Sequence, residues 1–391
     1  MLELGIVGKP NTGKTTLFNA LTACNAPVAS YPFTTIEPNV GVTYVRTKCP
    51  CVELGVTCNP QNSRCINGTR FVPVRVIDVA GLIEGAHHGR GLGNKFLDNL
   101  RMAAVLIHVV DASGSTDSEG RPCEPGTHDP LQDLDFLEKE IDLWLEGIIN
   151  REWEKLERRI KTERIDLVDE LAKRLSGLGI TREHVAMALK EAGFELSKFC
   201  SQLRKISKPM IIAANKVDIQ TSEQNLERLK KTGRMVVPIS AEAELVLRRA
   251  SEKGLISYTP GSGDFEILKP EALTDAQKAA LEGVRKLLKK WGSTGVQDLV
   301  DRAIREVLGL IVVYPVDDEN KLTDKKGNVL PDAFLVKKGT TAKEFAYKIH
   351  TELGETFLYA INARTKMRLA DDYQLQDGDI IKIVAAKGRA A

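Results

Sequence analysis

The chain has 391 residues, enough for two to three domains with a sizeable hydrophobic core. Its 55 Lys and Arg nearly balance 53 Asp and Glu, so overall charge gives no argument for a nucleic-acid partner. No apolar run is long enough to cross a bilayer, and the N-terminus enters a strand at once. These features predict a cytoplasmic protein with no membrane partner and no signal peptide, and we expect a monomer.

Short apolar segments bounded by polar turns recur along the chain, as expected for strands buried on both faces of a parallel sheet. They lie at residues 2–7, 42–45, 74–79, 105–111, 210–215 and 235–239. Helical stretches, the first at about residues 14–23, separate most of them. The predicted fold class is therefore α/β, with a doubly wound sheet.

The interval between the strands at 105–111 and 210–215 is unusually long. Residues 112–130 are rich in Gly, Ser, Pro and Asp, which predicts a loop. Residues 131–206 are charged and periodic, which predicts a helical hairpin or small bundle inserted into the sheet domain and broken near residues 177–179. The sheet domain then comprises residues 1–130 and 207–309.

Two helices are expected before Gly309. A capping-box pattern begins one at Thr274, and another is expected after Thr294.

The C-terminal part of the chain changes character after Gly309. A second capping-box pattern begins a helix at Thr341. Strand-like segments surround this helix in the order β-β-α-β-β. Residues 310–391 are therefore predicted to form a small mixed domain of their own.

The first strand runs into the pattern G-x-x-x-x-G-K-[ST], which predicts a phosphate-binding loop. Glycines let backbone N–H groups turn toward phosphates, and the helix N-terminus adds positive potential. Lys14 can then reach the β- and γ-phosphates, and the Thr15 hydroxyl can bind Mg²⁺. The predicted phosphate-binding residues are Gly8, Lys9, Pro10, Asn11, Thr12, Gly13, Lys14, Thr15 and Thr16.

An acid and a glycine follow the strand at 74–79 at the spacing of D-x-x-G. An acid at a strand end can hold the magnesium, so Asp78 is the predicted ligand, while the N–H of Gly81 can meet the γ-phosphate. This pattern alone is common. After a phosphate-binding loop at this distance, it indicates the second part of a nucleotide site.

Two further motifs follow strands and predict the residues that recognise the nucleotide base. In Asn215-Lys216-Val217-Asp218, the carboxylate of Asp218 can accept hydrogen bonds from guanine N1–H and the 2-amino group. Adenine offers neither donor, and a polar mismatch of this kind discriminates strongly. Asn215 can meet the N7 edge, Lys216 can cover the ring, and the segment Ser240-Ala241-Glu242 fits a backbone donor for guanine O6. The predicted ligands are GTP and GDP.

These motifs, with the segments at residues 31–41 and 89–97, resemble those of Obg-like GTPases of the YchF-type branch. The resemblance covers nearly the whole chain and implies that residues 310–391 form a β-grasp domain of the TGS type. It also implies that Thr35 binds magnesium and that the TGS domain and helical insert contact the ribosome or RNA. YchF-type proteins commonly carry Glu at the position of Asp218 and prefer ATP. Because this chain has Asp there, the ATP preference is not transferred to it.

A cluster of cysteines is not part of the pattern of the bacterial and eukaryotic YchF-type proteins. Four of the seven cysteines form the pattern C-x-C-x6-C-x6-C, namely Cys49, Cys51, Cys58 and Cys65. Thiolates on one small loop can bind Zn²⁺ tetrahedrally. A disulfide and buried free thiols are the open alternatives.

The residue after D-x-x-G is Leu82, which cannot orient water as a glutamine does in many small GTPases. Asn11 occupies the position that helps hold a monovalent cation such as K⁺ in potassium-activated relatives, and His87 or His88 offers a second way to position water. We therefore expect slow GTP hydrolysis and a switch-like role. An ATP-preferring YchF-type ATPase, or a GTP-binding regulatory module with negligible turnover, are the alternatives.

Overall fold

The computed structural model describes residues 2–22, 39–79, 101, 103–150, 166–193 and 195–386. These residues divide into two compact units, which are described separately. The first takes in residues 2–22 and 39–41 and the described part of 75–299. The second takes in residues 42–74 and 300–386.

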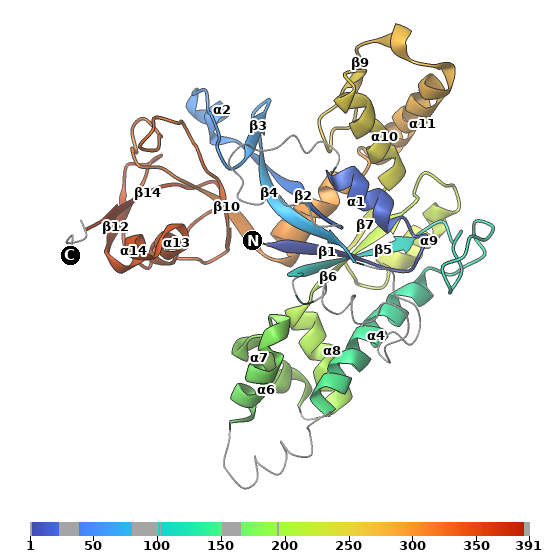
Figure 1. The fold of residues 1–391 in the computed structure, drawn as a ribbon, viewed down its shortest axis with the longest axis horizontal. Coiled ribbons are helices and arrows are strands. Elements are labelled where there is room, and N and C mark those ends of the chain that lie inside the picture. The colour runs from blue at the N-terminus through green and yellow to red at the C-terminus, as the bar shows by residue number, and fades with distance from the viewer. Residues whose placement is uncertain are drawn as a thin grey trace. The chain divides into compact units, whose positions relative to one another are not determined.

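A twisted, largely parallel sheet contains the strands that precede the nucleotide motifs (Figure 1). Its strand order is β2-β4-β1-β5-β6-β7, and the short β3 pairs with β4. The pairings of β1 with β4 and β5, of β5 with β6 and of β6 with β7 are all parallel. The bounds are β1 Glu3–Val7, β2 Val40–Lys48, β3 Arg64–Ile66, β4 Thr69–Asp78, β5 Val105–Asp111, β6 Met210–Asn215 and β7 Val236–Pro238.

Burial explains why these strands read as continuous apolar runs. Every residue of β1 and β5 is buried, because helices cover both faces of this part of the sheet. Helix α1 (Lys14–Thr22) packs against α10 (Ala241–Glu252), while α9 (Ser222–Lys230) contributes to a separate cluster with β6. The parallel ladder aligns the carboxyl ends of β1, β4, β5 and β6 at one edge, where the motifs begin.

The insertion after β5 is helical, as the periodicity predicted. It contains α4 (Leu131–Asn150), α6 (Leu167–Leu175), α7 (Arg182–Ala192) and α8 (Leu196–Ser207), gathered below the sheet in Figure 1. Leu137 and Ile141 of α4 and Phe199 of α8 join one core with sheet residues such as Leu106. The predicted break at residues 177–179 is confirmed: a 3₁₀ turn, Ser176–Leu178, ends at Gly179 with a positive φ of 71°.

The segment after α10 contains two short strands and two further helices. They are β8 (Ile256–Ser257), β9 (Glu266–Ile267), α11 (Asp275–Trp291) and α12 (Val296–Arg302). The Thr274 side chain accepts a hydrogen bond from the Gln277 N–H, and the Gln277 side chain reaches back to the Thr274 N–H. This confirms the predicted capping box, and α12 confirms the helix expected after Thr294.

The C-terminal segment forms a mixed five-stranded sheet in the order β11-β10-β14-β12-β13. Helix α13 begins at a second capping box, formed by Thr341 and Glu344, and Phe345 is fully buried in the core that this helix shares with the sheet. The bounds are β10 Leu310–Pro315, β11 Phe334–Lys337, α13 Ala342–Ile349, α14 Thr351–Glu355, β12 Phe357–Asn362, β13 Arg368–Leu369 and β14 Ile380–Ala385. The predicted β-β-α-β-β order is confirmed, with α14 and β13 in addition.

Several features differ from the sequence prediction. Strands β2 and β4 are longer than predicted, and the helix α2 (Pro50–Leu54) and the strand β3 were missed altogether. Residues 42–74 belong to the same compact unit as the C-terminal segment. The division into a sheet domain at residues 1–130 and 207–309, a helical insert at 131–206 and a C-terminal domain at 310–391 stays a prediction. None of the described helices is both long and apolar enough to span a membrane.

Candidate nucleotide-binding site

The phosphate-binding loop connects β1 to α1 at the carboxyl edge of the sheet. Gly8 has a φ of 144°, and a Cβ there would lie 2.5 Å from the carbonyl oxygen of Val109. Gly13 has a φ of 98°, and a Cβ there would lie 2.2 Å from the side-chain amide nitrogen of Asn215. Both glycines are therefore required by conformation and by close approach of neighbouring groups.

Lys14 folds back over this loop. Its Nζ donates a hydrogen bond of 2.6 Å to the carbonyl oxygen of Lys9, and its side chain is buried. Burial lowers the pKa of Lys14 to about 8, although the nearby carboxylate of Asp78 pulls in the opposite direction. A polyphosphate in the loop would supply the negative charge that favours the ammonium form.

The two predicted magnesium ligands within the described residues lie side by side. The hydroxyl of Thr15, at the start of α1, donates a 3.0 Å hydrogen bond to Oδ2 of Asp78, at the end of β4. Burial raises the pKa of Asp78, against the opposing effects of this bond and of Lys14. A hydroxyl and a carboxylate are the hard oxygen ligands that Mg²⁺ takes beside a nucleotide, so the donor set fits.

The predicted third magnesium ligand, Thr35, lies outside the described residues. So do the catalytic candidates Gly81, His87 and His88. Their roles stay predictions from the sequence.

The predicted base-reading motifs are joined to the phosphate-binding loop by hydrogen bonds. The side-chain amide of Asn215 donates to the Thr12 carbonyl at 2.9 Å and accepts from the Ala241 N–H at 3.0 Å. Ser240 donates a 2.8 Å hydrogen bond to Asp218 Oδ1 and caps α10 by accepting from the N–H of residue 243. The structure thus brings together Asn215, Asp218 and Ser240.

The surroundings of three further predicted residues of these motifs bear on their roles. The N–H of Ala241, a candidate donor to guanine O6, is already engaged by Asn215, and Glu242 is exposed on the first turn of α10. Lys216 has a φ of 65° and its Nζ lies 2.8 Å from Oδ2 of Asp111, which is fully buried. Burial opposes ionisation of Asp111, but Lys216 and Ser113 outweigh it and lower its pKa.

The loop at residues 112–130 and the first turn of α4 form hydrogen bonds and an ion pair with the phosphate-binding loop, which the sequence did not indicate. Lys9 Nζ forms a buried ion pair of 2.7 Å with Asp133, lies 3.2 Å from His128 Nε2 and donates to the carbonyl of Asp117. Asn11 donates a 2.8 Å hydrogen bond to the carbonyl of Gly120. In sequence, Asp117 lies 108 residues from Lys9, Gly120 lies 109 residues from Asn11 and His128 lies 119 residues from Lys9, and no motif spacing links them.

Comparisons with known proteins agree with this geometry. Three family models match: 50S ribosome-binding GTPase at residues 3–146, the G4 motif-containing domain of YGR210-like Obg-like GTPases at 213–318, and the TGS domain at 322–385. The GTP-binding protein MJ1332 of Methanocaldococcus jannaschii is 52% identical, and the match covers 99% of this chain and 100% of the relative. The chain belongs to the YchF/Obg-like GTP-binding proteins.

Two further relatives of this Obg-like protein are informative. The crystal structure of a GTP-binding protein from Pyrococcus horikoshii OT3 matches with a TM-score of 0.79 and 43% identity, covering 98% of this chain and 100% of that one. The protein of Bacillus subtilis called ribosome-binding ATPase YchF is 28% identical, covering 97% of this chain and 98% of its own length. The predicted P-loop fold with a helical insertion and a C-terminal TGS domain is thereby confirmed.

The four clustered cysteines of this Obg-like protein also come together. Their sulfur atoms all lie within 4.8 Å of one another, and the structure contains them as free thiols. Burial opposes ionisation of Cys49, yet the Cys51 N–H and the Arg70 guanidinium outweigh it and lower the pKa of that thiol. Burial and the neighbouring thiols raise the pKa of Cys65 to about 11.

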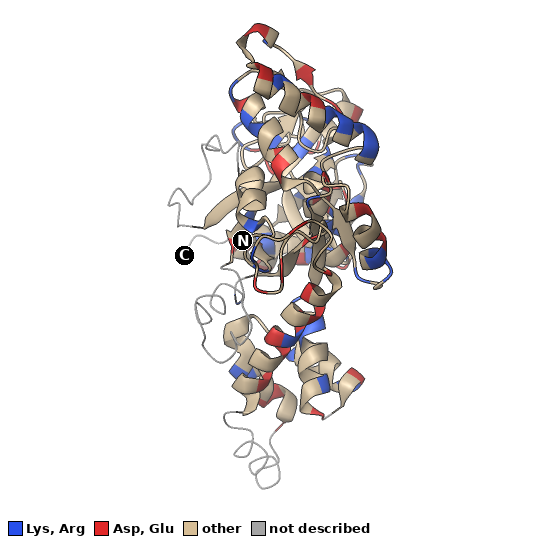
Figure 2. Ribbon diagram, turned by 90° about the vertical axis from the view of Figure 1, so that its right-hand side faces the viewer, with Lys and Arg blue, Asp and Glu red and all other residues tan. Residues whose placement is uncertain are grey.

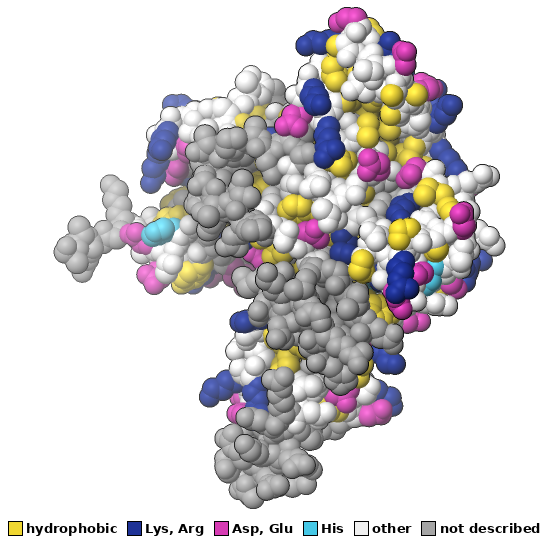
Figure 3. Space-filling view, turned by 45° about the vertical axis from the view of Figure 1, so that its right-hand side comes forward, with side chains coloured by type: hydrophobic (Ala, Val, Ile, Leu, Met, Phe, Trp, Pro, Cys, Tyr) yellow, Lys and Arg dark blue, Asp and Glu magenta, His cyan; other side chains and the backbone are white. Residues whose placement is uncertain are grey.

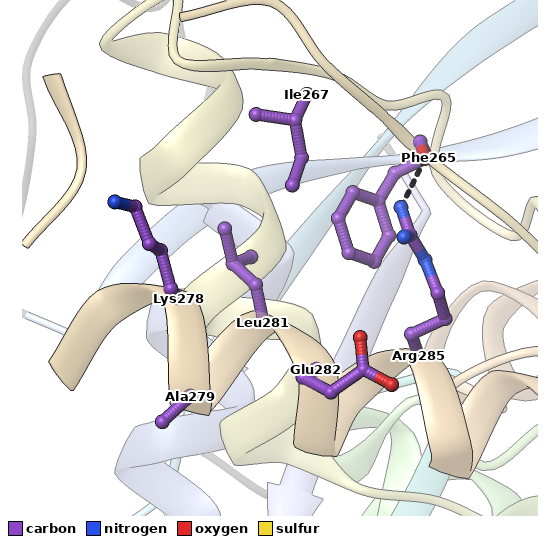
Figure 4. A pocket seen from close by; sticks show the side chains of 7 residues that line it. All are labelled: Phe265, Ile267, Lys278, Ala279, Leu281, Glu282 and Arg285. Atoms are coloured by element: carbon purple, nitrogen blue, oxygen red, sulfur yellow. Dashed lines mark hydrogen bonds between the residues drawn. The ribbon is translucent and has the colours of Figure 1, made fainter. Parts of the chain in front are cut away.

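An open pocket lies away from the nucleotide motifs. Figure 4 shows Phe265 and Ile267 facing Leu281 and Arg285 of α11. Arg285 donates a 3.1 Å hydrogen bond to the Phe265 carbonyl, and its guanidinium lies 4.6 Å from the centre of the Phe265 ring. Hydrophobic side chains gather over this segment at the top of the view in Figure 3. None of the nucleotide motifs contributes to this pocket.

Proposed function

We propose that this Obg-like protein binds GTP with Mg²⁺ and hydrolyses it slowly to GDP and phosphate, acting as a molecular switch. The observation that supports this most directly is the meeting of Thr15 and Asp78 beside the buried ammonium of Lys14. Magnesium would be held by the hydroxyl and the carboxylate, and Lys14 would face the β- and γ-phosphates. The cation would neutralise charge that develops on the phosphates during hydrolysis.

Asp218 supports GTP over ATP as the substrate. Its carboxylate is positioned by Ser240 at the same edge of the sheet as the phosphate-binding loop. A carboxylate accepts hydrogen bonds from the guanine N1–H and 2-amino group, whereas adenine would leave it facing a lone pair. The relative from Bacillus subtilis is called an ATPase, so nucleotide choice is the point on which this protein should differ from it.

The substitution Asp218→Asn should exchange guanine for xanthine recognition. The new amide would present an N–H to the guanine 2-amino group, two donors facing each other, but would match the carbonyl that xanthine carries at that position. We expect GTP affinity to fall by at least about tenfold and xanthosine triphosphate affinity to rise. Competition binding with fluorescent nucleotides measures both.

Glu227→Gln, an equivalent change of an exposed acid on α9, is the matched control and should leave both affinities unchanged. If Asp218→Asn bound GTP as tightly as the natural protein, Asp218 would not be the base reader.

Turnover should be slow and stimulated by potassium. With Leu82 in place of a water-orienting glutamine, we expect an unassisted rate on the order of 10⁻⁴ to 10⁻² s⁻¹. A K⁺ ion bound through Asn11 would stabilise the transition-state charge, so replacing Na⁺ by K⁺ should raise the single-turnover rate. Asn11→Ala should abolish the difference between the two salts.

Asn67→Ala is the control for this change, because Asn67 also has a positive φ but lies in the turn between β3 and β4. Equal rates in both salts would refute the cation mechanism. Complete absence of turnover under every condition would favour a regulatory module that uses bound GTP structurally.

The cellular partner we propose is the ribosome, in a GTP-dependent complex. Support comes from the match to the 50S ribosome-binding GTPase model and from the relative called ribosome-binding ATPase YchF. Along the described helices, basic and acidic residues interleave (Figure 2), so recognition would rest on particular contacts of the TGS domain and the helical insert rather than on bulk charge.

Sedimentation tests this partner directly. The full-length protein should pellet with purified ribosomal subunits when it is loaded with a non-hydrolysable GTP analogue, and it should stay in the supernatant with GDP. Recovery only in the supernatant with both nucleotides would contradict the ribosomal role while leaving the GTPase proposal intact.

A further inference from the structure

The cysteine cluster has the spacing of a metal site. The Sγ atoms of Cys49 and Cys58 are 3.9 Å apart and those of Cys51 and Cys65 are 3.8 Å apart. With Zn–S bonds of about 2.3 Å, the sulfurs of a tetrahedral zinc site lie about 3.8 Å from one another. A disulfide would require a separation of about 2.05 Å. The arrangement therefore matches four ligands around one cation better than two bonded pairs.

The backbone of this segment is shaped to bring the four thiols together. Cys49 is the residue before α2 and Cys51 lies in its first turn, so the start of one helix supplies two ligands. The helix ends at Gly55 with a positive φ of 63°, which turns the chain back toward Cys58. Cys65 is contributed by β3. Cys49 and Cys51 are buried, whereas Cys58 and Cys65 are half-buried. The cluster therefore lies at the edge of the protein interior.

A buried arginine next to the cluster points to a negatively charged group there. Arg70 is fully buried, and its guanidinium donates to the Cys49 sulfur at 3.4 Å, to the Ser63 hydroxyl at 3.0 Å and to the Leu330 carbonyl at 3.1 Å. Within the described ranges, no acidic side chain forms an ion pair with it. The charge of Arg70 acts to lower the pKa of the Asp332 carboxyl, but the two groups do not form an ion pair.

A buried cation is costly without a compensating charge, and four thiolates around one Zn²⁺ carry a net charge of −2. The guanidinium of Arg70 would balance that charge and donate an N–H to a ligating sulfur. Hydrogen bonds of this type orient ligands and tune metal sites in general.

We propose that Cys49, Cys51, Cys58 and Cys65 bind one Zn²⁺ as a structural centre. Four protein sulfurs complete the tetrahedron and leave no open position for substrate or water, so this centre has no catalytic role. Zinc is favoured because four soft thiolates in tetrahedral geometry suit it, with iron as the competing metal.

The centre would hold the segment at residues 49–66 in the conformation that contacts the C-terminal part of the same unit. The side chain of Asn59 accepts a hydrogen bond from the N–H of Val329. Asn62 accepts from the N–H of Ala333 at 2.9 Å and donates to the carbonyl of the same residue at 3.1 Å. A segment this short has little apolar core of its own, so a metal would be the main constraint on its fold.

Metal analysis of the full-length protein tests this proposal. Protein purified under reducing conditions without added chelator should contain about one zinc per chain, and Cys58→Ser and Cys65→Ser should each lose it. Both replaced residues are half-buried, which limits the damage to folding. Cys123→Ser, a half-buried cysteine outside the cluster, is the matched control and should retain the zinc. Replacement of zinc by Co²⁺ should give the intense thiolate-to-cobalt absorption of a tetrahedral site.

The outcomes separate the alternatives. Wild-type protein that contains no metal and has four titratable thiols in the cluster would overturn the proposal, as would two disulfides mapped by mass spectrometry under non-reducing conditions. One iron per chain would overturn the assignment of zinc. GTP affinity provides an independent readout: it should be the same in Cys58→Ser as in the wild type, because the phosphate-binding loop belongs to the other compact unit.

Hydrogen exchange tests the structural role separately. Removal of the metal should speed amide exchange in residues 49–66 and 328–333, with no change in α13 of the C-terminal sheet domain. Unchanged exchange in both segments would refute the role assigned to the centre even if zinc were present.

Discussion

The structure depends on the meeting of two strand ends at the carboxyl edge of one parallel sheet. Residues Ile6 of β1 and Asp78 of β4 are paired in register, so the loop that follows β1 and the carboxylate that ends β4 must be neighbours. The Thr15–Asp78 hydrogen bond is the result. A hydroxyl and a carboxylate fixed by the backbone in this way can hold magnesium without reorganisation, which is the condition for efficient electrostatic stabilisation.

The phosphate-binding loop is supported from two sides. On one side, the Asn215 side chain forms hydrogen bonds with both Thr12 and Ala241, so the predicted base-reading segment and the loop form one connected set of hydrogen bonds. On the other side, the buried pair of Lys9 and Asp133 fixes the loop to the first turn of α4. Because α4 is the first helix of the insertion, this ion pair connects the phosphate-binding loop directly to the insertion.

Much of the fold and the phosphate site could be predicted from the sequence because the signals are local. Buried strands such as β5 are continuous apolar runs, and the loop from Gly8 to Thr15 is a contiguous pattern. The pair of Lys9 and Asp133 could not be predicted, since it is set by how a loop of more than a dozen residues closes. The helix α2 was missed because it is only five residues long, and the convergence of the cysteines was left open because spacing alone does not fix geometry.

Equilibrium binding of nucleotides to the purified wild-type protein in the presence of Mg²⁺ tests the central claim most directly. GTP and GDP should bind, removal of magnesium should weaken GTP binding, and a large excess of ATP should fail to displace bound GTP. Measurable preference for ATP, or no affinity for guanine nucleotides, would contradict the roles given to Lys14 and Asp218.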